Sequence, residues 1–161
     1  MDSGTPHKPL VYGGARARSV VKAQQFRCQC EQLSPAELAI SVDSAESPDL
    51  ARSASAGSLD RALHTATCQA CGHEQVLSAP YTYHDGAARI FVLVLPEAWR
   101  HRELLERAEL LRELAHEDSR LPDYVLEFGV VYGSAGLQQC LHQARGRSQD
   151  ADRDANRLRE V

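Results

Sequence analysis

Four of the five cysteines in this chain form two close pairs, and this arrangement constrains the fold more than any other feature. The first pair is Cys28-Gln29-Cys30, and the second is Cys68-Gln69-Ala70-Cys71. Thirty-seven residues separate the two pairs, so a shared role for all four thiols requires the chain to fold back on itself. In a reducing compartment, paired cysteines more often hold a metal ion or carry out redox chemistry than form stable disulfides.

The second pair has the spacing of a metal-binding turn. A two-residue gap lets the sulfur atoms of Cys68 and Cys71 face one ion, and Gly72 can adopt the positive φ that such a tight turn needs. Backbone N–H groups that point towards the thiolates would disperse their charge. Zinc takes four ligands in a tetrahedron, with Zn–S distances of about 2.3 Å, so this pair supplies half of a site.

The first pair is predicted to supply the other half. Residues i and i+2 of an extended strand point to the same side, so both sulfur atoms can reach one ion, although with a different geometry from that of a two-residue gap. The sequence therefore predicts one structural zinc ion that is held by Cys28, Cys30, Cys68 and Cys71.

Two other interpretations of the cysteines stay open. His73 could replace Cys68 as a ligand, an arrangement that is similar to the SWIM type of zinc site. Cys68 and Cys71 could instead form a thiol–disulfide redox pair, but such pairs gain reactivity from a helix N-terminus, and strand-like residues follow Cys71. The fifth cysteine, Cys140, lies near leucines in a predicted helix and is expected to be a small buried apolar residue.

The residues that follow the first pair predict alternating strands and a short helix. Apolar alternation predicts a strand over 37–43. A short helix is predicted over 47–62, with Ser47 as its cap and Pro48 in its first turn. A hairpin is predicted over 63–80, around the second cysteine pair, and β-branched and aromatic residues predict a strong strand before Pro96.

The last third of the chain predicts a helix, a strand and a second helix. Over 97–117, apolar residues recur at helical spacing between Arg and Glu: Trp99, Leu104, Ala108, Leu111 and Ala115. A strand is predicted over 124–133 and a closing helix over 135–145. The predicted fold class is α+β, with a zinc-ribbon-like β region, an inserted short helix, and then helix–strand–helix.

These features together resemble the CpXC family of bacterial and archaeal proteins. The resemblance rests on both cysteine pairs, on Tyr83-His84-Asp85 and on residues 121–141, and it spans about residues 26–142. Family members normally have Cys-Pro-x-Cys at the first pair, whereas this chain lacks the proline and one residue of the gap. The resemblance implies a zinc-ribbon-like, metal-binding domain and implies little about activity.

Composition divides the chain into three segments. Residues 1–24 lack apolar periodicity and are predicted to be a disordered arm. Residues 25–145 are the predicted zinc-binding domain, and residues 146–161 are a charged tail that is expected to be disordered or a frayed helix. No secretory signal is recognisable and the longest apolar run, 90–96, is too short to cross a bilayer as a helix, so a cytoplasmic location is expected.

The motifs favour binding over catalysis. No Ser-His-Asp order, glycine-rich phosphate loop or His-Glu-x-x-His helix occurs, and four sulfur ligands leave zinc no open position. His84 and Asp85 could act as a base and its orienting carboxylate, but Asp-Gly after a strand is typical of a hairpin turn. The expected function is a non-catalytic domain that contacts an unknown protein partner through the exposed part of helix 97–117.

Nucleic-acid binding is the alternative function. A basic arm beside a zinc ribbon could contact phosphates, and Arg16, Arg18, Lys22 and Arg27 provide such charges. However, a formal net charge of −4 gives the whole chain no attraction to nucleic acid. Four charges spread over this segment are more typical of a solubilising region.

Overall fold

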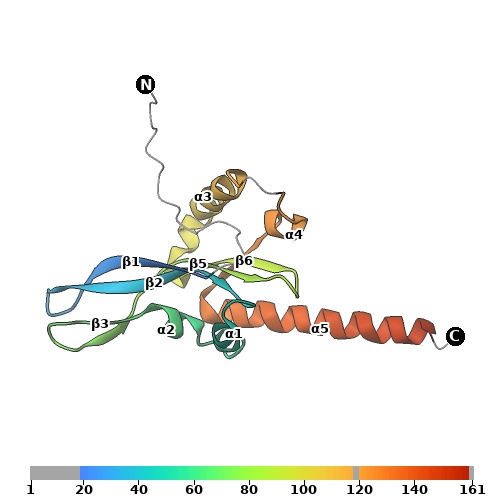
Figure 1. Ribbon diagram of the computed structural model, residues 1–161, viewed down its shortest axis with the longest axis horizontal. Coiled ribbons are helices and arrows are strands. Elements are labelled where there is room, and N and C mark those ends of the chain that lie inside the picture. The colour runs from blue at the N-terminus through green and yellow to red at the C-terminus, as the bar shows by residue number, and fades with distance from the viewer. Residues whose placement is uncertain (1–18, 118–119, 160–161) are drawn as a thin grey trace, which may run out of the picture.

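The computed structural model describes residues 19–117 and 120–159, and its centre is a five-stranded mixed sheet with helices on both faces (Figure 1). The strand order is β1-β2-β5-β6-β7. These strands are β1 (Val20–Arg27), β2 (Leu33–Asp43), β5 (Tyr81–Asp85), β6 (Ile90–Leu95) and β7 (Gly129–Tyr132). Neighbours pair antiparallel in β1–β2 and β5–β6, and parallel in β2–β5 and β6–β7.

The connection between the parallel strands β2 and β5 carries the inserted helices and a separate ribbon. It contains α1 (Pro48–Ser55), α2 (Leu59–His64), β3 (Thr65–Thr67) and β4 (Glu74–Val76). Strands β3 and β4 pair antiparallel as a two-stranded ribbon, which Figure 1 places beneath the β1–β2 hairpin. The α+β fold with a short helical insert and a β ribbon is therefore confirmed.

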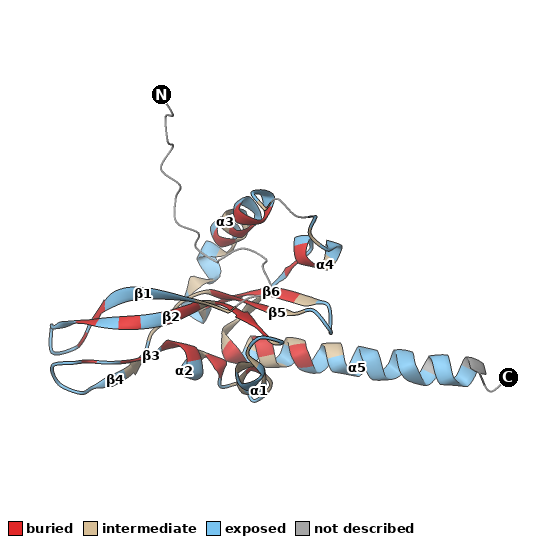
Figure 2. Ribbon diagram, viewed as in Figure 1, coloured by how far each residue is buried: buried red, intermediate tan, exposed pale blue. Residues whose placement is uncertain are grey.

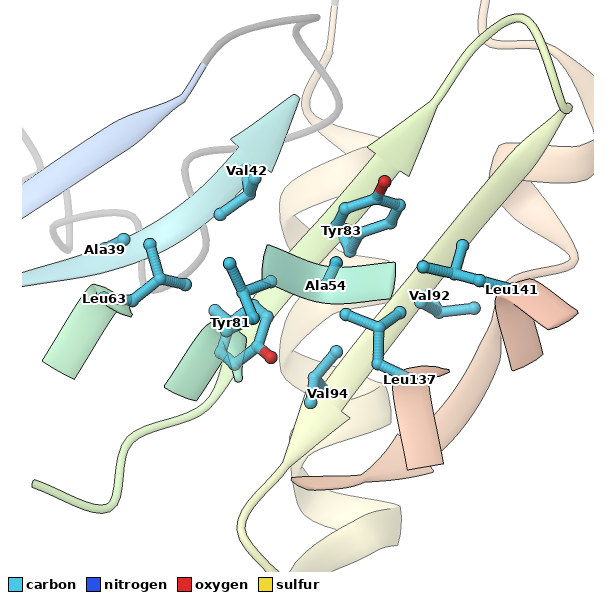
Figure 3. Packing of buried hydrophobic residues seen from close by; sticks show 11 residues of the cluster. Ala39, Val42, Ala54, Leu63, Tyr81, Tyr83, Val92, Val94, Leu137 and Leu141 are labelled. Atoms are coloured by element: carbon cyan, nitrogen blue, oxygen red, sulfur yellow. The ribbon is translucent and has the colours of Figure 1, made fainter. Parts of the chain in front are cut away.

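Two hydrophobic clusters hold the helices against opposite faces of the sheet. Residues of β6 alternate between them, because successive side chains of a strand point to opposite faces: Val92 and Val94 belong to the first core cluster, and Phe91, Leu93 and Leu95 to the second. The first core cluster packs the sheet against α1, α2 and α5 (Gly133–Arg159), as Figure 3 shows. The second packs it against α3 (Glu103–Ala115) and α4 (Asp123–Leu126).

Reciprocal hydrogen bonds join the start of α5 to the start of α2. The backbone N–H of Asp60 donates to Ser134 Oγ at 2.7 Å, and the backbone N–H of Ser134 donates to Asp60 Oδ2 at 2.8 Å. Each side chain thereby satisfies an N–H group that a helix terminus leaves without an intrahelical partner. This exchange fixes α5 so that Leu137, which is fully buried, enters the first core cluster.

Regular secondary structure extends past both ends of the predicted domain over 25–145. Strand β1 begins at Val20, so residues 20–24 are paired with β2 rather than part of a disordered arm, while residues 1–18 lie outside the described residues. Helix α5 continues to Arg159, so the predicted charged tail is helical as far as that residue. Figure 2 shows that this end of α5 is exposed. The division into an arm, a domain over 25–145 and a tail stays a prediction.

Two elements in the last third also differ from the prediction. The helix after Pro96 begins as a 3-10 helix, η1 (Glu97–Arg102), and becomes α-helical at Glu103. Helix α4 occupies residues 124–126 of the strand predicted over 124–133, and only Gly129–Tyr132 is strand. Pro122 precedes α4 with the extended backbone that suits an N-cap, and this turn signal outweighs the apolar run that follows it.

Helix α3 turns a different face to the core from the one that its apolar spacing indicates. Leu110 and Leu114 are buried in the second core cluster, and the side chains of Glu106 and Glu113 are also buried. By contrast, the side chain of Leu104 is 81% exposed. The outer surface of this helix is therefore rich in leucine.

Candidate metal centre

The four paired cysteines converge where two turns meet. Cys28 and Cys30 lie in the turn between β1 and β2, and Cys68 and Cys71 in the turn between β3 and β4. Figure 1 shows these two hairpin ends side by side. The four sulfur atoms lie within 4.8 Å of one another, and Cys28–Cys71 and Cys30–Cys68 are each separated by 3.6 Å. A tetrahedral ion with bonds of about 2.3 Å spaces its sulfur ligands by about 3.8 Å, so this group is close enough to hold a metal ion.

The second turn has the backbone hydrogen bonds of a tight metal-binding turn. The N–H of Cys68 donates to the carbonyl of His73, and the N–H of Gly72 donates to the carbonyl of Cys68, both at 2.9 Å. Gly72 has a φ of 73°, as its position after Cys71 predicts. No atom lies within 4 Å of the place where a Cβ on Gly72 would be, so the backbone conformation, rather than space, favours glycine here.

The first turn repeats this arrangement with one residue fewer between its cysteines. The N–H of Cys28 donates to the carbonyl of Gln32 at 3.0 Å, and the N–H of Glu31 donates to the carbonyl of Cys28 at 2.9 Å. Glu31 follows Cys30 as Gly72 follows Cys71, and it has a positive φ of 66°. The turn with the short Cys28-x-Cys30 spacing thus places a non-glycine residue in the left-handed conformation.

Ser34 is a residue of this centre that the sequence prediction missed. Its hydroxyl accepts a hydrogen bond from the N–H of Gln69 at 3.0 Å and donates one to Cys68 Sγ at 3.5 Å. The side chain is buried at the start of β2. Donation by Ser34, followed by donation from the N–H groups of Cys71 and Ala70, lowers the pKa of the Cys68 thiol to about 6.

The other thiols have the opposite effect on Cys71. The N–H of His73 lowers the pKa of Cys71, but the neighbouring thiols of Cys28, Cys30 and Cys68 raise it to about 12. Four adjacent thiols cannot all become thiolates without a positive charge among them, because like charges in one site disfavour ionisation. A metal cation bound among the four sulfur atoms would supply that charge.

One side of the centre is apolar and the other faces solvent. Cys28 and Cys68 are buried, whereas Cys30 and Cys71 are exposed. The two buried cysteines belong to a third core cluster with Phe26, Ala36 and Ala66. This cluster covers the inner half of the centre and is much smaller than the two clusters of the sheet.

The remaining candidates lie apart from this group. His73 is exposed and is not among the four converging residues, so the geometry supports Cys68 rather than His73 as the fourth member. The residues after Cys71 lead into β4 rather than a helix. Cys140 lies in α5, where it is partly buried against the first core cluster and burial raises its pKa.

The carboxylate that contacts His84 is that of Asp43, not that of the neighbouring Asp85. His84 Nδ1 lies 2.8 Å from Asp43 Oδ2, and its Nε2 lies 2.9 Å from the hydroxyl of Tyr124. Asp85 instead accepts the N–H of Ala88 in the turn between β5 and β6, as expected for a hairpin turn. The network joins β2, β5 and α4, which are remote in sequence, and no local motif indicates it.

The basic segment is only partly described. Arg16 and Arg18 lie outside the described residues, and Lys22 and Arg27 are exposed on β1. Over residues 19–117 and 120–159, none of the helices has the length and apolar character that crossing a membrane requires.

Comparison with protein families matches residues 26–139 to the model described as CpXC protein. The matched region contains both cysteine pairs and extends from the end of β1 into α5. No curated protein and no solved structure matches the chain.

Proposed function

The chain belongs to the CpXC family, and from that premise we propose that it is a domain stabilised by one structural zinc ion that acts through contacts with other proteins and has no catalysis of its own. The proposed ligands are Cys28, Cys30, Cys68 and Cys71. The observation that carries this proposal is the approach of four sulfur atoms to within 4.8 Å from two separate turns.

The donor set supports zinc or iron over ions that prefer oxygen ligands, such as magnesium or calcium. Thiolates are soft ligands, and an arrangement of four sulfur atoms in a tetrahedron suits zinc or iron. In the second turn, backbone N–H groups donate to the sulfur atoms of Cys68 and Cys71, and such donors stabilise thiolates. A cytoplasmic setting, which the proposal assumes, keeps these thiols reduced and available to the ion.

A structural role follows from the number of ligands and from the size of the third core cluster. Four sulfur ligands complete the coordination of zinc and leave no position for a substrate. Strands β3 and β4 have three residues each, so the ribbon buries little apolar surface. Metal binding would therefore contribute directly to the folding free energy of this part of the domain.

Exposed leucines on α3 support the part of the proposal that concerns protein contacts. Leu104, Leu105 and Leu111 are 81%, 69% and 47% exposed, and they lie within eight residues of one helix. Exposed apolar side chains that gather on one surface often mark an interaction site.

Metal analysis of the purified protein under reducing conditions tests the proposal. About one zinc ion per chain is expected, whereas a protein without metal contradicts it, and iron in place of zinc would change the assigned ion. The Cys68→Ala variant should lose the zinc, and the His73→Ala variant should retain it. The reverse pattern would assign the ligand role to His73.

Alkylation separates a structural centre from a reactive thiol. In the zinc-loaded protein, the four cysteines should react slowly with iodoacetamide near neutral pH, and a chelator should make them react rapidly, because a bound thiolate is a poor nucleophile. Rapid alkylation of one of the four while zinc stays bound would support redox or catalytic chemistry instead.

A further inference from the structure

A groove lies between α3 and the β1–β2 hairpin, away from the cysteines. Its volume is about 410 Å³, within the range of pockets that bury a ligand. Leu38, Ile40 and Pro80 form an apolar floor, and Trp99 and Leu105 form the wall on the side of η1 and α3. Within the part of the chain that the structure describes, this groove is a concave apolar surface whose floor and wall residues belong to none of the three core clusters.

The wall of the groove is held in place by side-chain contacts. The guanidinium of Arg102 lies over the ring of Trp99, 4.3 Å from its centre. The same guanidinium is paired with the carboxylate of Glu106 at 2.7 Å. A preorganised aromatic side chain next to an exposed leucine is the kind of anchor that dominates protein interfaces.

The rim of the groove presents positive charge to solvent, although it contains both signs. The side chains of Glu106 and Glu109 are only 7% and 18% exposed, whereas those of their partners Arg102 and Arg112 are 45% and 57% exposed. Lys22 adds a further exposed cation on β1. A binding partner therefore meets an apolar floor that is bordered by cations.

We propose that this groove binds an amphipathic helix of a partner protein, whose apolar side chains are flanked by Asp or Glu. The inference rests on the proposed function, since it names the surface and the chemistry through which the domain makes protein contacts. Apolar residues at i, i+4 and i+7 of the partner helix would contact the floor and Leu105, as in other complexes of a helix with a groove. Its carboxylates would face Lys22, Arg102 and Arg112.

Two designed peptides test the proposal with zinc-loaded protein. Both carry leucines at i, i+4 and i+7; one has Glu at the flanking positions, and the other has Lys at the same positions. Fluorescence anisotropy should show the Glu peptide binding about tenfold tighter or more, with an affinity that falls as salt screens the charges. Equal affinity for the two peptides would overturn the proposal.

Matched variants locate the binding surface. Leu105→Glu and Arg112→Glu should each weaken binding of the Glu peptide by about tenfold or more, because they alter the wall and the rim. Leu104→Glu places the same charge on the same helix, but Leu104 does not line the groove, so binding should be unchanged. Equal losses for Leu104→Glu and Leu105→Glu, at unchanged thermal stability and zinc content, would contradict the assignment.

The remaining outcomes separate this inference from the metal centre. Failure of the Glu peptide to bind a protein with one zinc ion per chain overturns the groove assignment and leaves the metal proposal standing. Specific binding of the Glu peptide by a protein that holds no zinc would support the groove assignment and overturn the metal proposal. Dimerisation that Leu105→Glu abolishes, but Leu104→Glu does not, would assign the groove to a second copy of the chain and overturn the proposed partner.

Discussion

Glu31 and Gly72 have equivalent places in the two cysteine turns, and their substitutions should have opposite effects. Both have positive φ, and a left-handed conformation costs an L residue roughly 1–2 kcal/mol. Glu31→Gly should raise the free energy of unfolding by about 0.5–1 kcal/mol, since the greater freedom of glycine in the unfolded chain offsets part of the gain. Gly72→Ala should lower it by about 1 kcal/mol. Urea unfolding of the zinc-loaded protein measures both, and a loss of stability in Glu31→Gly would contradict the interpretation.

Ser34 should affect metal affinity although it is not a proposed ligand. Ser34→Ala removes the donor to Cys68 Sγ and the acceptor for the N–H of Gln69. Loss of such a supporting contact typically lowers metal affinity by about 10–100-fold. Competition with a chromogenic chelator measures the change. Ser55→Ala, which alters a serine in α1 that is bonded to Arg145, should leave zinc affinity unchanged.

His64 should make the stability depend on pH. Burial lowers the pKa of His64 below 6.5, although the hydrogen bond between its Nε2 and the Ala39 carbonyl raises the pKa and so offsets part of this shift. Below about pH 6.5, His64 is therefore protonated more readily in the unfolded chain than in the folded protein. The contribution of neutral His64 to stability is complete above about pH 6.5 and is lost as pH falls from there towards the lowered pKa.

Urea midpoints at several pH values check this dependence. Between about pH 7.5 and 5.5, the wild type should lose more stability than His64→Gln, while the exposed-site variant His101→Gln should keep the wild-type slope. Zinc content must be measured at each pH, because protons compete with the metal for thiolates. Equal slopes for the wild type and His64→Gln would show that His64 does not carry the effect.

The residues of the candidate metal centre could be predicted from sequence only where they lie together in one short motif. Cys68, Cys71 and Gly72 form one short motif, so their turn could be recognised from spacing. Ser34 could not be recognised, because its role depends on the approach of β2 to a turn that lies 34 residues further along the chain. The same holds for the contact between His84 and Asp43, which crosses from β5 to β2.

At the scale of elements, the two ends of α5 should contribute very differently to stability. Deleting residues 150–161 should change the free energy of unfolding by less than about 0.5 kcal/mol, as for other exposed positions, while the helical signal in circular dichroism falls. Leu137→Ala, at a fully buried position near the start of the helix, should cost about 2–5 kcal/mol. A large loss on deletion would show that the exposed end of α5 has a binding partner within the protein.

Helix α3 shows why a helix can be predicted more readily than its buried face. Its leucines, Leu104, Leu105, Leu110, Leu111 and Leu114, lie on more than one side of the helix. Spacing alone therefore indicates a helix, but the face that it favours, with Leu104 and Leu111, is not the one that is buried. The sheet selects Leu110 and Leu114, which meet Phe128 and β6 in the second core cluster, and the other leucines stay exposed.

At the scale of the whole molecule, removal of the metal should loosen the two hairpin ends without unfolding the sheet. Cys28 and Cys68 belong to the third core cluster, whereas the two larger clusters lie on opposite faces of the five-stranded sheet. After chelation, amide hydrogen exchange should become about tenfold faster or more in β3 and β4. The amides of β5 and β6 should keep their protection, and its loss would show that the whole fold depends on the ion.

The fold class could be predicted from sequence, but the order of the strands could not. Strand, helix and turn signals are local, and they indicate an α+β domain with a ribbon. The parallel pairs β2–β5 and β6–β7 depend on which faces the connecting helices cover, and that is decided by packing across the whole sheet. Strand β7, with only four residues at the edge, is positioned by β6 and the second core cluster more than by its own pattern.

The position of the four cysteines in the first half of the chain has a consequence for folding during synthesis. All four lie within the first 71 of 161 residues, and Phe26, Ala36 and Ala66, which pack around them, lie in the same part. Leu137 and Leu141, which complete the first core cluster, come much later. Because a chain leaves the ribosome N-terminus first, we expect the nascent polypeptide to bind the proposed zinc ion before α5 has been synthesised.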